Sequence, residues 1–319
     1  MLKNHRFAIT LSLLILLSLL LTACSLDKNA VETRWLVVAA DDKLVQSGLI
    51  TALIPPFEKA NNLRIKLLPV DPLEALTYAR EGGVEVLITS GGADLQKLAG
   101  EAPIIPPYSD KPLPTPTAAP EPTPTPTPLP FEVPFAERKV ILWSPLVLVG
   151  PLDDSQAGPN RTTVTKPLQQ LVINNAKFIS PAREPGLNLQ LERLWKLIGL
   201  ADPASRGTGY RVIAGDGVEA LQEAEKTGAY TVIPLDIYIN NHNINKSKIV
   251  FDKDVALFFP YEATIRNYIS VPGKDITLSR KFVEYLLSAP SQNIISEFGK
   301  DTKQLPLYRP QNYPVYLPG

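Results

Sequence analysis

Short apolar runs alternate with helical patterns in the first third of the chain. Nearly continuous apolar residues at 35–40, 64–70 and 84–89 predict three buried strands. One helix is expected at 47–59, bent or interrupted at Pro55-Pro56, and a second helix is expected between the last two strands. This β-α-β-α-β order predicts a parallel sheet that is covered on both faces.

The same alternation resumes in the second half of the chain. Strands are expected at 146–149, 177–179, 230–234 and 255–259, and helices at 165–174, 187–198, 219–226, 278–287 and 291–298. Two successive α/β units, closed by C-terminal helices, predict two lobes with a cleft between them. The chain after Leu305 holds four Pro and three Tyr and is expected to lie against the surface.

Between the two units lies a segment that cannot join a sheet or a helix. Thirteen of the 32 residues at 103–134 are proline, which fixes φ and lacks an N–H, so an extended, disordered segment is expected. Its plain interpretation is a tolerated surface insertion, and the alternative is a tether or a ligand for a partner.

The predicted division is a leader at 1–23, a first lobe at 31–102 and 250–305, the insertion at 103–134, a crossover strand at 135–150, a second lobe at 151–249 and a tail at 306–319.

The first residues have the pattern of a secretory signal. A basic start is followed by an apolar run at 7–21, about 15 residues, whereas a membrane-spanning helix needs about 20. The run ends in Leu21-Thr22-Ala23-Cys24, which resembles a bacterial lipobox and implies cleavage before Cys24 and lipidation of its sulfur. The alternative is an ordinary cleavage site with an incidental Cys. The lipobox predicts a protein held by lipid chains on the extracytoplasmic face of a bacterial membrane, at the cell membrane or in the periplasm.

Composition excludes several classes of function. The chain has 32 basic and 32 acidic residues; without residues 1–23, which hold Lys3 and Arg6 but no acid, 30 basic and 32 acidic remain. Nucleic-acid binding needs a basic surplus, so no nucleic-acid partner is expected. One Cys allows no disulfide framework, and His242 is the one histidine outside the leader. Catalytic motifs are absent, so we expect a binding protein with no cofactor and no metal, not an enzyme.

Three predicted strand-to-helix turns are candidates for a ligand site. They follow the first strand at 41–47, the third strand at Ser90, and the strand that ends at Ser180, where the turn runs to Gly186. Turns of this kind present free N–H groups at the carboxyl edge of the sheet, where α/β proteins bind small polar ligands. The alternative, that they are only well-capped helices, is equally compatible with the pattern. Gly215-Asp216-Gly217 is interpreted as a turn and helix cap.

Several segments resemble one family. They are 48–59, 82–87, 146–151 with Asp153-Asp154, 178–195 and 226–231. Together they resemble the substrate-binding lipoproteins of tungstate-type ABC importers, which belong to the type II periplasmic-binding superfamily. The resemblance implies an α/β, two-lobed fold with a mostly parallel sheet in each lobe. It also implies a monomer that delivers a small molecule, such as the oxyanions tungstate or molybdate, to an ABC permease.

The sequence departs from the family where the ligand would sit. The family's Thr and Ser after the first strand are replaced at 40–44, and its second-lobe turn keeps Ser180 and Gly186 but has Arg183 displaced by two positions. Motif position gives the ligand-binding candidates Asp41, Asp42, Ser90, Ser180, Arg183, Gly186 and Thr231. One alternative is a degenerate binding domain that serves as a surface sensor or interaction module. Another uses Asp41 and Asp42 to bind a cation or an amine.

Overall fold

The structure is a computed structural model, and it describes residues 34–71, 74–75, 77–78, 83–90, 135–266 and 276–313. The leader, Cys24, the 103–134 segment and the last residues lie outside the described residues, as do the expectations that concern them. In the described part of the chain, no helix is long and apolar enough to cross a membrane.

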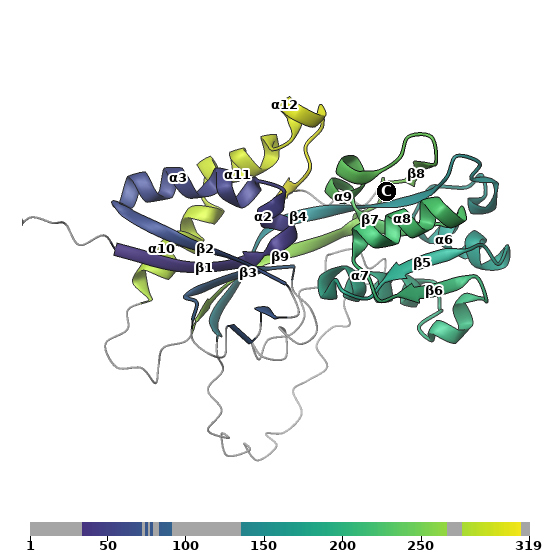
Figure 1. Cartoon of the computed structure of the whole chain (residues 1–319), viewed down its shortest axis with the longest axis horizontal. Helices are drawn as coiled ribbons and strands as arrows, with labels where there is room; N and C mark the ends of the chain where they lie inside the picture. The colour runs from purple at the N-terminus through teal and green to yellow at the C-terminus, as the bar shows by residue number, and fades with distance from the viewer. Residues whose placement is uncertain are drawn as a thin grey trace, which may run out of the picture.

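The larger lobe is built on a mixed sheet (Figure 1). Its strands are β1 (Arg34–Asp41), β2 (Leu63–Val70), β3 (Val86–Thr89), β4 (Phe135–Pro151), β9 (Phe258–Arg266) and β10 (Arg309–Pro310), in the order β10-β4-β9-β3-β1-β2. The helices of this lobe are α2 (Asp42–Gln46), α3 (Leu49–Asn61), α10 (Thr277–Leu287), α11 (Ala289–Glu297) and α12 (Lys300–Lys303). The first three strands are parallel as predicted, but β9 pairs antiparallel with β3 and β4, because it returns from the other lobe.

Helix α3 runs through Pro55 and Pro56, so the predicted interruption is wrong. Both prolines are exposed, whereas Leu49, Leu53 and Phe57 of the same helix are buried against the sheet. An apolar stripe at this helical spacing holds the helix in place although two backbone donors are missing.

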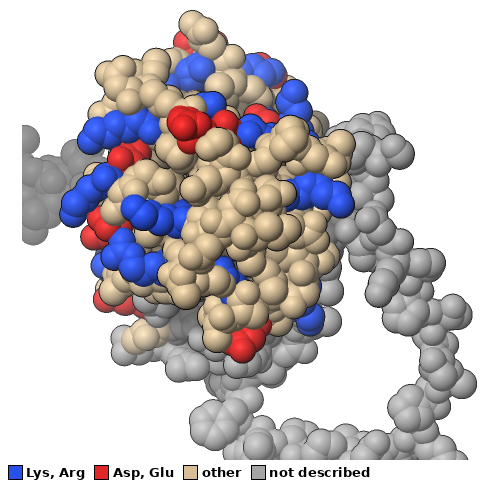
Figure 2. Space-filling model, turned by 90° about the vertical axis from the view of Figure 1, so that its right-hand side faces the viewer, with Lys and Arg blue, Asp and Glu red and all other residues tan. Residues whose placement is uncertain are grey.

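The smaller lobe follows the crossover. It contains β5 (Phe178–Pro181), β6 (Tyr210–Ile213), β7 (Thr231–Pro234) and β8 (Ser247–Phe251), with helices α6 (Thr165–Ile173), α7 (Pro185–Leu197), α8 (Gly217–Thr227) and α9 (Leu235–Asn241) and the 3₁₀ turns η1 (Ser155–Ala157), η2 (Pro203–Arg206) and η3 (Val255–Leu257). Strands β5 and β6 are parallel, and Phe178 also bridges to Tyr230 in parallel orientation. On the face of this lobe in Figure 2, basic and acidic side chains are interspersed, in keeping with the balanced charge of the sequence.

Strand β4 belongs to both lobes. Its residues up to Pro145 pair with β9, and its residues from Leu146 onward pair with β7 and β8. The strand extends well beyond the apolar run at 146–149 and spans the range expected for the crossover strand, 135–150. The change of partner falls at Pro145, which has no N–H to donate to a neighbouring strand.

Of the described residues after Leu305, Leu307 and Tyr308 are buried in the fold, whereas 311–313 lie on the surface as predicted. Leu307 and Tyr308 are 3% and 1% exposed, and β10 pairs with β4. The hydroxyl of Tyr308 donates to Oδ2 of Asp236 in α9 at 2.9 Å, so this segment ties the smaller lobe to the larger one. An aromatic ring with one polar atom is buried readily when that atom finds a partner.

Candidate functional site

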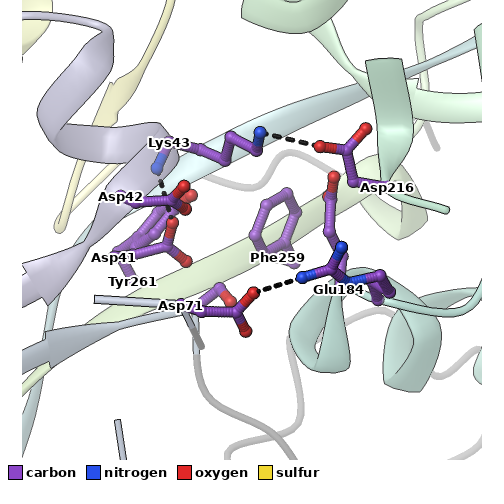
Figure 3. A pocket seen from close by; sticks show the side chains of 10 residues that line it. Asp41, Asp42, Lys43, Asp71, Glu184, Asp216, Phe259 and Tyr261 are labelled. Carbon is purple, nitrogen blue, oxygen red and sulfur yellow. Dashed lines mark hydrogen bonds and ion pairs between the residues drawn. The ribbon is translucent and has the colours of Figure 1, made fainter. Parts of the chain in front are cut away.

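A cavity of about 230 Å³ lies between the two lobes (Figure 3). We call it the interlobe pocket. Its lining residues are Asp41, Asp42, Lys43, Asp71 and Ser90 from the larger lobe, Arg183, Glu184 and Asp216 from the smaller lobe, and Phe259 and Tyr261 from β9. Carboxyl groups therefore face the pocket from both sides, and two aromatic rings close its floor.

The ends of strands place the larger-lobe residues in the pocket. Asp41 is the last residue of β1 and caps α2, where its Oδ1 accepts from the backbone N–H of Lys43 at 3.0 Å. Ser90 follows the last residue of β3. Since β1 and β3 are parallel neighbours, their carboxyl ends meet at one edge of the sheet. Alternation along β9 brings Phe259 and Tyr261, two residues apart, to the same face.

Helix starts place the smaller-lobe acids. Glu184 is the N-cap residue of α7 and Asp216 is the N-cap residue of α8. The Asp216 side chain accepts from the backbone of Val218 and Glu219, and Glu219 completes the capping box. The prediction of a turn and helix cap at 215–217 is thus confirmed.

Two ion pairs cross the pocket between the lobes. Lys43 Nζ lies 2.7 Å from Asp216 Oδ2, and Arg183 Nη2 lies 2.9 Å from Asp71 Oδ2. Figure 3 shows them on opposite sides of the cavity. Burial opposes the charge of Lys43, yet the hydrogen bond to Asp216 raises the Lys43 pKa above its ordinary value. We call these pairs the two straps; each is partly exposed and therefore contributes only about 0–1 kcal/mol.

Gly186 brings the lobes into direct contact. A Cβ at this position would lie 2.4 Å from the backbone oxygen of Ser90 and 2.7 Å from its Cβ. The second residue of α7 therefore packs on the segment after β3 so closely that only glycine fits. In this structure the two lobes are therefore in direct contact at Gly186.

Glu184 is the more buried of the two smaller-lobe acids that line the pocket. It is 9% exposed, and its Oε1 accepts from the N–H of Gly217 at 2.6 Å. Among the described residues no hydrogen-bond donor reaches its Oε2, and Figure 3 shows the carboxyl group directed into the cavity. Burial raises the pKa of Glu184 to about 8. The N–H of Gly217 opposes this rise, and nearby acids add to it.

Asp41 faces Glu184 from the other lobe. Burial raises the pKa of Asp41 to about 7, and the neighbouring Asp42 carboxylate adds to the rise. The pocket holds five carboxyl groups against the two cations of the straps. With all of them ionised the formal charge is 2 − 5 = −3. Neutral Asp41 and Glu184 would leave −1, so protonation relieves much of the repulsion.

The folding stability is expected to fall as the pH rises from about 4 to 8. Asp41 and Glu184 titrate near 7 and 8 in the folded protein, against ordinary values of 3.8 and 4.5. The folded state therefore binds more protons than the unfolded state in this window, and the free energy of unfolding decreases with pH until both groups ionise. Melting temperatures measured from pH 5 to 9 check this, and Glu184→Gln should reduce the slope. An unchanged slope in the variant would show that Glu184 ionises normally.

The structure brings four of the seven candidate residues together. Asp41, Asp42, Ser90 and Arg183 line the interlobe pocket, and Arg183 is engaged there by Asp71. Gly186 lies behind the wall, against Ser90.

The other two candidates do not reach the cavity. Ser180 and Thr231 are 4% and 0% exposed in β5 and β7, and neither lines the pocket. Helix α8 packs on both strands, and both side chains are buried in the smaller lobe. Their expected role as ligand contacts is not supported by this placement.

Sequence reasoning missed six lining residues: Lys43, Asp71, Glu184, Asp216, Phe259 and Tyr261. Asp71 and Asp216 each fit the pattern of a helix cap, which hid their second role. Lys43 and Glu184 lie inside two of the predicted turns and could have been found by including every charged residue there. The aromatic residues belong to β9, which the sequence does not connect with the turns.

The remaining candidate features are structural. Asp154 lies 2.8 Å from Arg161 and 3.3 Å from Lys248, and these partners lower its pKa although burial opposes them. His242 stacks on Tyr238 at 4.2 Å between ring centroids. In the part of the chain that the structure describes, no group of three His, Cys, Asp or Glu residues could hold a metal ion.

No family model matches the sequence. The chain is 24% identical over 309 residues to the tungstate-binding protein TupA of Peptoclostridium acidaminophilum, covering 92% of this chain and 94% of that protein. A tungstate ABC transporter structure from Geobacter sulfurreducens is 24% identical and covers 85% of this chain and 100% of its own, with a TM-score of 0.62. The tungstate-binding protein TupA of Desulfovibrio alaskensis G20 is 22% identical, with coverages of 87% and 99% and a TM-score of 0.68.

These likenesses show the fold. The fold is the two-lobed, type II fold of periplasmic binding proteins, as predicted. The chain's homologues include tungstate-binding proteins. The resemblance to tungstate-type substrate-binding proteins seen in the sequence is therefore confirmed. The domain limits given from the sequence remain predictions.

Proposed function

We propose that this protein is an extracytoplasmic solute-binding protein of an ABC importer, not an enzyme. It captures a small solute between its two lobes and presents the closed form to a permease. The observation that carries the proposal is the interlobe pocket, which is lined by polar residues from both lobes at the place where a two-lobed fold closes. The homologues named for tungstate make oxyanions the first ligands to test.

The proposal includes attachment to the membrane. Lipid on Cys24 would hold the monomer at the extracytoplasmic face, close to the permease. Two or three acyl chains are enough for stable anchoring. This part rests on the lipobox pattern in the sequence.

The proposal is tested by calorimetric titration of the full chain with tungstate, molybdate, sulfate and phosphate, and with organic cations. We expect saturable heat with at least one small solute, together with a higher melting temperature because a ligand that binds only the folded state stabilises it. If no solute of either charge produces heat or a melting shift, the importer function is contradicted.

One observation favours a second function, that of a surface sensor or interaction module. The two straps join the lobes through the protein's own side chains, with Lys43 on Asp216 and Arg183 on Asp71. Because ion pairs of the protein itself bridge the cleft, closure of the lobes would not require a bound solute. Small-angle scattering of the ligand-free protein separates the two functions, because the module is expected to be closed without solute and the importer to close upon adding it.

A further inference from the structure

We propose that the interlobe pocket binds a small organic cation, an ammonium- or guanidinium-bearing solute, instead of a fully deprotonated oxyanion. This inference rests on the proposed function and names the ligand class of the same site. Carboxyl groups from both lobes would surround the positive charge, and the aromatic floor of β9 would contact the apolar part.

The first support is the charge of the wall. The pocket has five carboxyl groups and two cations, and each cation already pairs with a carboxylate of the opposite lobe. With Asp41 and Glu184 protonated, the wall keeps a formal charge of −1 and both of its cations are paired, which disfavours a dianion. When both acids ionise, the charge reaches −3 and favours a cation.

The second support is Glu184. This side chain is 9% exposed, points into the cavity, and has one oxygen bound to the N–H of Gly217. Its other oxygen is not reached by a donor from any residue that the structure describes. This oxygen is open to the cavity, where the N–H of a bound cation could donate to it once Glu184 is ionised.

The third support distinguishes an organic cation from a metal ion. The described residues hold no group of three acids or other ligands spaced for a metal. Instead Phe259 and Tyr261 line the pocket beside the acids. Aromatic faces attract ammonium and guanidinium groups and also pack on the carbon atoms attached to them.

A cation and an oxyanion are expected to show opposite pH dependences of affinity. The groups that face Asp41 and Glu184 are the acids Asp42, Asp71 and Asp216, the cations Lys43 and Arg183, and Tyr261. Burial raises the pKa of Asp41 to about 7 and that of Glu184 to about 8, so both carry protons near neutral pH. A bound cation favours their ionised forms, and its affinity should rise from pH 6 to 8.5. An oxyanion favours the protonated forms, and its affinity should fall over the same range.

The test is calorimetry of the full chain with choline, putrescine, ethylammonium and guanidinium, against tungstate, molybdate, sulfate and phosphate. We expect at least one organic cation to bind, with proton release measured by comparing buffers of different ionisation enthalpy. Glu184→Gln should weaken this binding at least tenfold. The matched control is Glu284→Gln on the exposed face of α10, which should leave the affinity unchanged.

A melting curve of each variant shows that it is folded, and Asp42→Asn at the pocket rim provides a second variant if Glu184→Gln fails to fold. Binding of an oxyanion but of no cation would overturn the inference and leave the proposed function standing. Cation binding that Glu184→Gln and Asp42→Asn leave unchanged would also overturn it. If neither class of solute binds, the inference and the proposed function both fail.

Discussion

Replacing Gly186 with alanine is expected to hold the two lobes apart and to weaken ligand capture by roughly ten- to a hundredfold. The added Cβ would lie 2.4 Å from the backbone oxygen of Ser90, and a backbone atom of the opposite lobe can move away only if the lobes separate. Overpacking of this kind costs about 1–3 kcal/mol. The cost applies wherever Gly186 contacts Ser90 and disappears when the lobes move apart.

Small-angle scattering in the presence of a bound solute measures the separation, and calorimetry measures the affinity. Because alanine is a better helix former than glycine, α7 itself should not lose stability, so the melting temperature of the ligand-free protein should not fall. The matched control is Gly83→Ala, where an added Cβ has nothing within 4 Å. If Gly186→Ala closes and binds like the unaltered protein, the direct contact between the lobes is not part of closure.

Replacing Trp195 with alanine is expected to destabilise the fold by about 3–5 kcal/mol. This side chain is 1% exposed and meets Phe178 edge-on, with 5.0 Å between ring centroids, and Tyr210 in the same manner at 5.5 Å. Its removal leaves a cavity between α7 and the β5-β6 pair. Nearby Arg206 should stay in place, because Glu192 holds its guanidinium at 2.6 and 2.9 Å.

Denaturation by guanidinium chloride, followed by circular dichroism, measures this loss. Trp35→Ala is the matched control, since Trp35 is 58% exposed and its removal should change the free energy of unfolding by no more than about 0.5 kcal/mol. A loss below about 1 kcal/mol for Trp195→Ala would mean that the smaller lobe does not depend on this aromatic cluster.

Local patterns predicted the parallel part of the fold and failed where distant segments meet. The apolar run at 35–40 lies in β1, which is buried on both faces over most of its length from Leu36 onward. The apolar run indicated only 146–149 of β4, because charged residues interrupt its first half, although the crossover strand expected at 135–150 covers it. Arg138 is 6% exposed and lies 2.9 Å from Glu262 of β9, a partner that no local pattern can supply. A buried ion pair makes a strand look like a polar loop.

The candidate site was predictable to the same extent. The rule that parallel strands end at one edge brought Asp41 and Ser90 together correctly. The floor of the pocket was not predictable, because the apolar run at 255–259 begins as the 3₁₀ turn η3 and continues as β9 from Phe258 onward. A shift of a few residues decides which side chains face the cleft.

The shared strand β4 also limits how the halves of the molecule can move. A strand cannot slip by one residue against its neighbours without turning every side chain to the opposite face. Because β4 is in register with β9 on one side of Pro145 and with β7 and β8 on the other, sliding is ruled out for both halves. We therefore expect relative motion of the lobes to take the form of rotation and twisting about the short stretch around Pro145.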